Sequence, residues 1–199
     1  MVIQSCYLRD HAEDAHFVHA GTNVIGVADG VGGYRKKGVD ASAFARGLMC
    51  NAFSEVVAVA PGAHVCPRTL LDRAYRKTVA SRTPAASTAV ILSLSGRTLR
   101  WAYAAVGEVP GKEGDVVVVG TDGLFDNVSD DELERIVAMG AAMGFSPKNM
   151  ADVIAGVAYE AARCSYRDTP YSLLERKERG TFSTGGKQDD ITLSITKDY

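Results

Sequence analysis

The chain has 199 residues, 46% of them hydrophobic, and its 22 basic and 24 acidic side chains give a formal charge of −2. This length predicts one domain over residues 1–199 that buries a core without disulfides or a structural metal. The balanced charge argues against nucleic acid or an anionic membrane surface as a partner. No apolar run reaches the roughly 18–20 residues that span a bilayer.

The N-terminus and the cysteines indicate the compartment. Met1–Asp10 has no basic region followed by an apolar stretch, so no secretory signal is predicted. The four cysteines are far apart and form no C-x-x-C pair, which predicts reduced and mostly buried thiols rather than a zinc site or a disulfide framework. They are Cys6, Cys50, Cys66 and Cys164. A cytoplasmic or organelle-interior protein is expected, not a secreted one.

The first half of the chain predicts two hairpins with two helices between them. The hairpins pair His16–Ala20 with Asn23–Ala28, and Ser87–Leu94 with Thr98–Val106. Apolar residues at helical spacing predict a helix over Asp40–Ala58, and Pro67 begins a second over Pro67–Ser81.

The second half begins and ends with a strand. The predicted elements are a buried Val-rich strand over Asp115–Gly120, helices from Ser129 to about Met139 and from Ser146 to about Cys164, and a strand over Ile191–Thr196. A capping box of Ser129 and Glu132 opens the first helix. The polar stretch Ser165–Lys187 predicts a long loop. Strands and helices come in blocks, which favours an α+β sandwich over a doubly wound fold.

Four aspartates lie where a strand meets a loop. They are Asp14, Asp29, Asp122 and Asp189. A glycine follows two of them, which lets a ligand approach the backbone closely. A single Asp-Gly pair is more often a simple turn, but carboxylates gathered at sheet ends supply the oxygen ligands that Mg²⁺ and Mn²⁺ prefer. Two such ions 3.5–4 Å apart, roughly, can activate water for attack at phosphorus.

Five motifs in chain order resemble those of the metal-dependent serine/threonine protein phosphatases of type 2C. They are Glu13–His16, Val27–Gly33, Ser87–Ala89, Thr121–Asp126 and Gly185–Thr192. Together they span nearly the whole chain. The Asp-Gly-Val-Gly-Gly sequence resembles one branch of the family, whose members are often organellar, with Val31 where many members have histidine.

The resemblance implies a fold and a reaction. The fold is an α/β/β/α four-layer sandwich, and the reaction is hydrolysis of phosphoserine or phosphothreonine in a phosphorylated protein substrate. A hydroxide bridging two Mg²⁺ or Mn²⁺ ions would attack phosphorus without a covalent enzyme intermediate. A monomer is expected, in the cytoplasm or inside an organelle, with a mitochondrion or plastid implied if a transit segment has been removed.

The resemblance also implies roles for individual residues. Asp29 would bridge both ions, with the Gly30 carbonyl on one of them. Asp122 and Asp189 would complete one ion, and Asp14 would hold the other through water. The catalytic set would be Asp29, Asp122 and Arg9, where Arg9 is either the phosphate-binding arginine or a solvated surface charge.

The chain departs from the family pattern between about residues 107 and 115. Only Val109–Gly114 connects Glu108 to the next strand, so a family insert with sheet strands and a carboxylate of a third metal is missing. Glu108 either replaces that carboxylate or is a turn residue, with the turn favoured. The alternative function is therefore a catalytically weak or inactive pseudophosphatase that binds a partner.

Other polar clusters have simpler interpretations. His11, His16 and His19 are expected to be mostly structural, because a strand points His16 and His19 to opposite faces and offers no zinc geometry. A minor role for His11 or His16 at substrate or metal stays open. The basic residues Arg35–Lys37 favour a solvated loop over a steering patch.

Overall fold

A computed structural model describes the chain except for residues 1, 61–62, 104–105, 181 and 198–199. The chain divides into two compact units. Unit 1 comprises Met1–Ile3, Glu13–Asp115 and Lys197–Tyr199, and unit 2 comprises Gln4–Ala12 and Val116–Thr196. The assignment of one domain to residues 1–199 stays a prediction.

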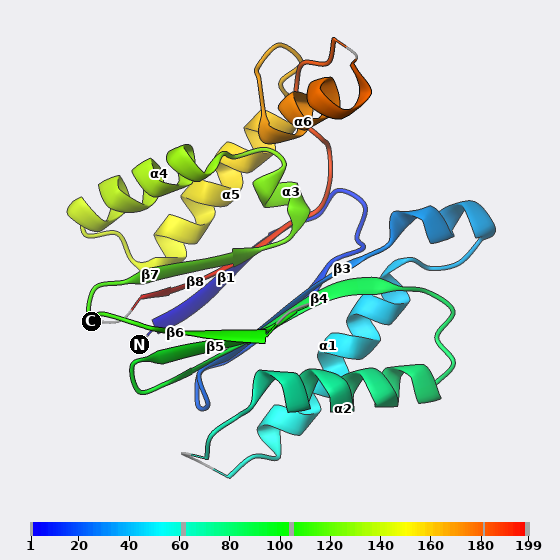
Figure 1. The fold of residues 1–199 in the computed structure, drawn as a ribbon, viewed down its shortest axis with the longest axis vertical. Helices are drawn as coiled ribbons and strands as arrows, with labels where there is room; N and C mark the ends of the chain where they lie inside the picture. Colours follow the sequence, from blue (N-terminus) through cyan, green and yellow to red (C-terminus); the bar gives the residue numbers. More distant parts are fainter. Residues whose placement is uncertain (1, 61–62, 104–105, 181, 198–199) are drawn as a thin grey trace. The chain divides into compact units, whose positions relative to one another are not determined.

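Unit 1 is an antiparallel sheet with two helices on one face (Figure 1). In spatial order its strands are β2 (Ala15–His19), β3 (Val24–Gly30), β4 (Ser87–Ser95), β5 (Thr98–Ala102) and β6 (Val106–Pro110). The helices are α1 (Ser42–Val57) and α2 (Pro67–Ala80), and a 3-10 helix covers Gly32–Lys37. Both predicted hairpins and both predicted helices are thus present, with the edges shifted by a few residues.

The core of unit 1 lies between β3 and α1. Val24, Ala45 and Ala52 are completely buried there. Gly26 is required in β3, because a Cβ at this position would lie 2.2 Å from the Phe17 ring on β2. The close packing fixes the hairpin whose end carries Asp29.

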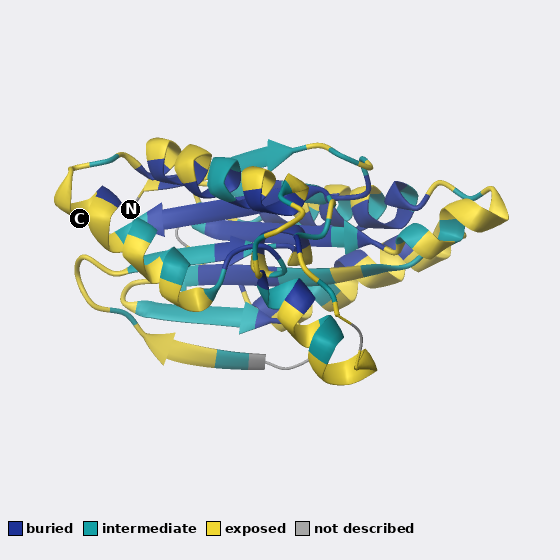
Figure 2. Cartoon of the chain, turned by 90° about the horizontal axis from the view of Figure 1, so that it is seen from above, coloured by how far each residue is buried: buried dark blue, intermediate teal, exposed yellow. Residues whose placement is uncertain are grey.

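Unit 2 contains a sheet with the strand order β1 (Val2–Leu8), β8 (Ile191–Lys197) and β7 (Val116–Gly120). Its helices are α3 (Asp122–Phe125), α4 (Asp130–Ala142), α5 (Pro147–Arg163) and α6 (Pro170–Arg179). Ile191, Leu193 and Ile195 alternate along β8 and share a core cluster with Ile154 of α5. Burial is concentrated on the strands, while the outward turns of the helices are exposed (Figure 2).

The predicted loop over Ser165–Lys187 is wrong, because it contains α6. Thr169 caps this helix and forms a capping box with Ser172, Pro170 occupies its first turn, and Gly180 ends it with a φ of 63°. These are ordinary helix signals. The high polarity of the segment concealed them, since a helix with only Ser172 buried shows no apolar stripe.

The predicted strand over Thr98–Val106 is also wrong in extent. It ends at Ala102, and β6 forms a separate strand in the stretch expected to be mostly connection. Residues 104–105 lie outside the described chain. Glu108 is a strand residue rather than a turn residue, and its carboxylate lies 2.9 Å from Arg100 on β5. Gly107 faces Trp101 so closely that a Cβ would meet the indole at 2.2 Å.

The expectation of mostly buried cysteines is wrong as well. Cys50 and Cys66 are exposed, and Cys6 and Cys164 are half-buried. Cys50 lies on the outward face of α1, and Cys66 lies at the N-cap of α2, where the chain turns into the helix. All four are free thiols.

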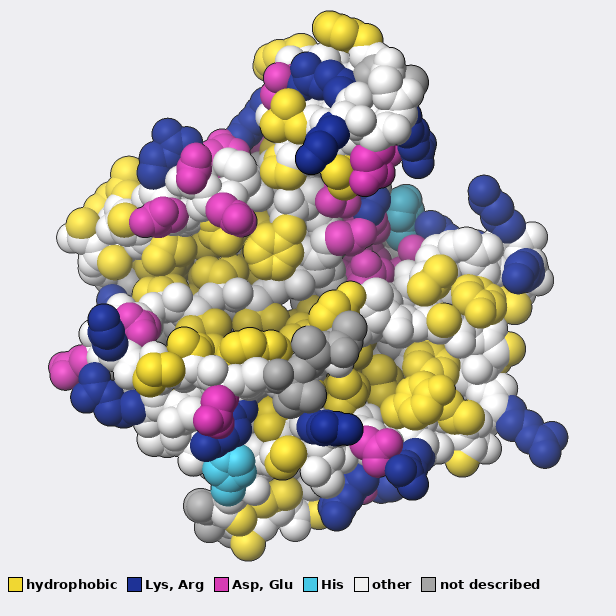
Figure 3. All heavy atoms as spheres, in the orientation of Figure 1, with side chains coloured by type: hydrophobic (Ala, Val, Ile, Leu, Met, Phe, Trp, Pro, Cys, Tyr) yellow, Lys and Arg dark blue, Asp and Glu magenta, His cyan; other side chains and the backbone are white. Residues whose placement is uncertain are grey.

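The surface seen in Figure 3 has no single basic patch, because Lys and Arg side chains are spread among acidic ones. Within the described part of the chain, no helix combines the length and the apolar character needed to cross a membrane.

Candidate functional site

Asp14 and Asp29 are cross-strand neighbours in unit 1. The β2–β3 register pairs Ala15 with Ala28, and the Gly30 N–H donates to the Glu13 carbonyl at 3.2 Å. Continuing this antiparallel register by one residue places Asp14 opposite Asp29. Side chains in such a pair lie on one face of the sheet, with Cβ atoms typically about 4.5–5.5 Å apart. The hairpin therefore brings two of the predicted carboxylates together.

Gly30, which follows Asp29, has no room for a side chain. A Cβ there would lie 2.4 Å from the Ala41 carbonyl oxygen and 2.8 Å from that of Glu13. On the other side, β4 pairs Thr88 with Asp29, and the Ser87 hydroxyl donates to the Asp29 carbonyl at 2.7 Å. The Asp29 backbone is thus held from both neighbouring strands.

Glu13 contacts the glycine-rich segment that follows β3 and helps to fix its position. Its buried carboxylate lies 2.8 Å from the Arg35 guanidinium, and a Cβ on Gly32 would lie 2.8 Å from the same carboxylate. Arg35 is 48% exposed, so the predicted solvent exposure of this segment is found together with the ion pair to Glu13. Lys36 and Lys37 are exposed, as expected.

Asp122 and Asp189 are brought together in unit 2 by the pairing of β7 with β8. The Thr121 N–H donates to the Thr192 carbonyl at 3.0 Å, and the Thr192 N–H donates to the Thr121 hydroxyl at 3.2 Å. Asp122 is the first residue of α3, and Asp189 lies two residues before β8. The two carboxylates thus lie at the same end of these strands.

The Lys187 ammonium lies among three carboxylates of unit 2. Its Nζ is 2.5 Å from Asp122 Oδ2, 2.9 Å from Asp126 Oδ2 and 3.1 Å from Asp189 Oδ2. Burial opposes the charge of Lys187, but hydrogen bonds to Asp122 and Asp126 outweigh it and raise the pKa of this ammonium. Burial raises the pKa of Asp126, although the hydrogen bond from Lys187 acts in the opposite direction.

Asn127 connects the two segments that carry these carboxylates. Its completely buried amide donates to the Gly123 and Lys187 carbonyls, both at 2.9 Å, and accepts from the Lys187 N–H at 2.9 Å. A hydrogen-bonded amide of this kind fixes the relative position of two loops, since breaking it would leave buried polar groups unpaired. Asn127 follows the Thr121–Asp126 motif directly.

Arg9 lies in the loop after β1, where Asp190 organises the backbone. The buried Asp190 carboxylate accepts hydrogen bonds from three successive N–H groups, those of Asp10 at 2.5 Å, His11 at 2.7 Å and Ala12 at 2.9 Å. Ala12 has a φ of 65°, in the left-handed region, where its N–H donates to Asp190. The Arg9 side chain is exposed and makes no ion pair with a described residue.

Two histidines have different surroundings. His11 Nδ1 lies 3.7 Å from Asp189 Oδ1 in unit 2. Burial lowers the pKa of His16, which lies on β2 beside Asp14 and pairs with Val27. The neutral ring is thereby favoured, and the structural role of His16 stays a prediction.

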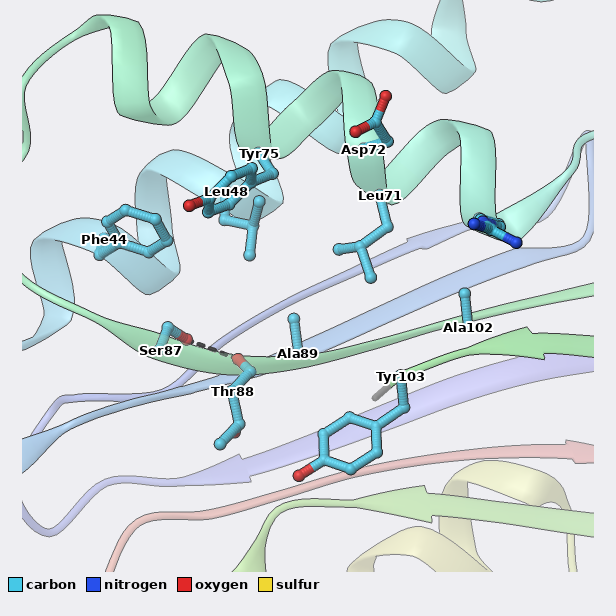
Figure 4. Close-up of a pocket in the computed structure, with 11 residues that line it drawn as sticks. Phe44, Leu48, Leu71, Asp72, Tyr75, Ser87, Thr88, Ala89, Ala102 and Tyr103 are labelled. Atoms are coloured by element: carbon cyan, nitrogen blue, oxygen red, sulfur yellow. Dashed lines mark hydrogen bonds between the residues drawn. The ribbon is translucent and has the colours of Figure 1, made fainter. Parts of the chain in front are cut away.

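A pocket in unit 1 lies beside β4 (Figure 4). It has a volume of about 640 Å³, and its walls come from α1, α2 and the ends of β4 and β5. Figure 4 shows Ala89 and Leu71 facing one another across it, while Thr88 and Tyr103 point to the opposite side of the sheet. Because Thr88 is the register partner of Asp29, the predicted carboxylate face is not the face that α1 and α2 cover.

Two relatives of known family identify the family of this chain. It is 50% identical over 238 residues to "Putative protein phosphatase 2C 24" of Oryza sativa subsp. japonica, with 98% of this chain and 76% of that protein covered. It is 47% identical to "Putative protein phosphatase 2C 23" of the same organism, covering 96% and 73%. The chain belongs to the protein phosphatase 2C family. The predicted family and enzyme class, protein serine/threonine phosphatase, are therefore confirmed.

Solved structures confirm the predicted type 2C phosphatase fold. The photosystem II phosphatase PBCP matches with a TM-score of 0.83 at 23% identity, covering 100% of this chain and 98% of that one. The PstP catalytic domain in complex with two manganese ions matches with a TM-score of 0.62 at 15% identity, covering 97% and 96%. No family model matches the chain.

This phosphatase chain is shorter than its relatives in the aligned region. The alignment with the first rice protein extends over 238 residues, although this chain has only 199 in all. The rice protein therefore contains a segment without counterpart here. Its position between about residues 107 and 115 stays a prediction.

The sequence pattern does not predict four further residues of the site: Lys187, Asp126, Asn127 and Asp190. All four stand inside or beside the motifs that carry the family resemblance. A signal for Lys187 was present, because a lysine two residues before a predicted metal ligand is an unusual neighbour for an acidic cluster. Its partners are 61 and 65 residues away, so no local pattern predicts the contact.

Proposed function

We propose that this chain hydrolyses phosphoserine and phosphothreonine in proteins with the help of two Mg²⁺ or Mn²⁺ ions. The observation that carries the proposal is the pairing of predicted carboxylates within each unit: Asp14 with Asp29 in unit 1, and Asp122 with Asp189 in unit 2. Membership of the protein phosphatase 2C family supports it. No observation on the described residues favours the non-catalytic alternative.

The donor groups fit hard divalent ions. Carboxylate oxygens and a backbone carbonyl are the ligands that Mg²⁺ and Mn²⁺ take, and neither thiolate nor imidazole is needed. The Lys187 ammonium serves as a stand-in ion, because the carboxylates of Asp122 and Asp189 already converge on its positive charge. We propose that Asp122 and Asp189 would hold one ion and that Asp14, through water, would hold the other, with Asp29 as the shared ligand and the Gly30 carbonyl on one ion, as the family resemblance implies.

When bound, the two ions supply Lewis acidity and make hydroxide available near neutral pH. The residues of the chain fix the positions of the carboxylates that would hold these ions. Asp29 is rigid because β2 and β4 flank it, and Asp122 and Asp189 are rigid because Thr121 and Asn127 tie their segments. Arg9 is exposed after β1, and its planar guanidinium suits the oxygens of a phosphate.

Hydrolysis of phosphoserine and phosphothreonine peptides by the purified chain tests the proposal. With Mn²⁺ we expect phosphate release that Asp29→Asn and Asp122→Asn each lower at least roughly a hundredfold, because each removes a charge that the ions need. Glu175→Gln on α6 is the matched control, since its carboxylate pairs with Arg179 of the same helix at 3.1 Å. Activity equal in the wild type and the Asp29 variant would refute the proposal.

The role of Arg9 has a separate kinetic signature. Arg9→Ala is expected to raise KM for a phosphopeptide by about tenfold while leaving Mn²⁺ binding unchanged, because it removes a phosphate contact and no ligand. An unchanged KM would show that Arg9 is a solvated surface charge and not a phosphate-binding residue.

The natural substrate is a phosphorylated protein in this proposal, and the chain acts as a monomer in the cytoplasm or in an organelle interior. Size-exclusion chromatography with light scattering tests the monomer. Imaging of the tagged protein in plant cells tests the compartment.

A further inference from the structure

The Lys187 ammonium contacts three carboxylates in unit 2. Lys187 Nζ contacts Asp122, Asp126 and Asp189 at 2.5 to 3.1 Å, and two of these are the proposed ligands of one metal ion. The Lys187 side chain is 30% exposed, Asp126 27% and Asp189 18%, so water screens these contacts incompletely, whereas Asp122 is 48% exposed. The three carboxylates therefore already have a positive charge beside them, which comes from the chain itself.

The backbone of Lys187 is anchored, whereas the ammonium is at the end of four rotatable bonds. Asn127 holds both the N–H and the carbonyl of Lys187, and the preceding Gly186 N–H donates to the Cys164 carbonyl at 3.0 Å. Gly186 has no room for a side chain, because its Cβ would lie 2.2 Å from the Ala161 carbonyl oxygen. Rotation of the side chain alone can thus move the charge.

A divalent ion and the Lys187 ammonium compete for the Oδ2 atoms of Asp122 and Asp189, which the ammonium already contacts. Mg²⁺ lies about 2.0–2.1 Å from its oxygen ligands, and the ammonium already contacts Asp122 at hydrogen-bond distance. The two positive charges would then repel one another at short range in a partly desolvated site. Asp126 has no proposed ligand role, so it can keep the ammonium after the other two contacts break.

We propose that Lys187 is a tethered cation that competes with the divalent ion for Asp122 and Asp189, and that Asp126 receives it when the ion binds. This inference rests on the proposed metal site. Without the ion, Lys187 neutralises part of the repulsion among the three carboxylates and keeps the site assembled. With the ion, its displacement lowers the metal affinity of the phosphatase.

Metal binding measured without turnover tests this inference. Isothermal titration calorimetry with Mn²⁺ is expected to show Lys187→Met binding the ion roughly tenfold more tightly than the wild type, because the competing charge is gone. Lys187→Arg, which keeps the charge, is expected to stay within about threefold of the wild type. Lys148→Met is the matched control, since Lys148 pairs with Asp152 on the surface of α5.

The metal-free state gives a second readout. In EDTA, Lys187→Met is expected to melt at a lower temperature than the wild type, because three carboxylates then repel without compensation. Mn²⁺ is expected to raise its melting temperature by more than that of the wild type. Should the Met variant fail to fold, Lys187→Gln removes the charge and retains a hydrogen-bond donor.

Asp126→Asn tests the receiving position. It is expected to weaken Mn²⁺ binding in the wild type and to have a smaller effect in the Lys187→Met background, because the displaced ammonium is then absent. Equal effects in both backgrounds would show that Asp126 does not act through Lys187 and would overturn that part of the inference.

The possible failures are distinguishable. If Mn²⁺ binds the wild type, Asp122→Asn weakens that binding, and Lys187→Met binds no more tightly than the wild type, the competition inference fails and the proposed function stands. If millimolar Mn²⁺ neither binds the wild type nor shifts its melting temperature, the proposed metal site itself fails.

Discussion

The Asp190 carboxylate accepts a hydrogen bond from the backbone N–H of His11 at 2.7 Å, although 179 residues separate the two in the sequence. The same oxygen also accepts from Asp10 and Ala12, so the loop that presents Arg9 is folded around it. A carboxylate bound by several N–H groups is a strong local anchor.

Asp190→Ala is expected to lower the free energy of unfolding by about 2–3 kcal/mol, because it leaves neighbouring N–H groups without their acceptor. Urea denaturation in EDTA measures this effect apart from metal binding. Asp190→Asn keeps one oxygen and is expected to be less destabilising. An unfolding midpoint of the Ala variant equal to that of the wild type would contradict the anchoring role.

Asn127→Ala is expected to destabilise the chain by roughly 2 kcal/mol or more, because it unpairs the buried Gly123 and Lys187 backbone groups. Mn²⁺ affinity is expected to fall as well, since the segments that carry Asp122 and Asp189 are no longer held together. Asn149→Ala on the exposed side of α5 is the control and is expected to change neither quantity. Calorimetric titration and urea denaturation of both variants provide the comparison.

Gly123→Ala is expected to be destabilising by about 2 kcal/mol or more, because overpacking against a backbone cannot be relieved by a rotamer change. Its Cβ would lie 2.0 Å from the Asp190 carbonyl oxygen. Gly156→Ala inside α5 meets nothing within 4 Å and is expected to stabilise by about 0.5–1 kcal/mol. Thermal melts that move both variants in the same direction would refute this pair of predictions.

Glu132 is expected to contribute an acid-sensitive part of the stability. Burial acts to raise its pKa, but the hydrogen bond from the Ser129 N–H and the Arg167 charge outweigh it, so its pKa is lowered from an ordinary value near 4.5. Its contribution is therefore fully present above about pH 4.5 and is lost as pH falls through the lower folded-state value.

Glu132→Gln removes the contribution of the ionised carboxylate to the free energy of unfolding. The difference in this free energy between the wild type and the variant is therefore expected to shrink from pH 7 toward pH 3. Urea denaturation at several pH values follows the difference, in which the titration of other carboxylates cancels. A difference that stays constant with pH would show that the Glu132 charge is not involved. The capping box with Ser129 would then act only through neutral hydrogen bonds.

Local signals in the sequence were sufficient for most elements. Pro67 and Ser146 begin helices as predicted, and the Ser129 capping box is present with both of its hydrogen bonds. These features depend on residues three or four positions apart, where steric and hydrogen-bond preferences act directly. The strands β1 and β6 were missed, because a strand exists only through the neighbour that pairs with it.

The sequence by itself determined the family, the four aspartates at strand ends and the glycines that must stand beside them, because these depend on residue type and spacing. The tertiary structure alone decided that Lys187 meets Asp122 and Asp126, and that Asp190 organises the loop of Arg9. Side chains far apart in the chain acquire such partners only when β7, β8 and α3 pack. The energy of a charge then depends on what surrounds it rather than on its neighbours in sequence.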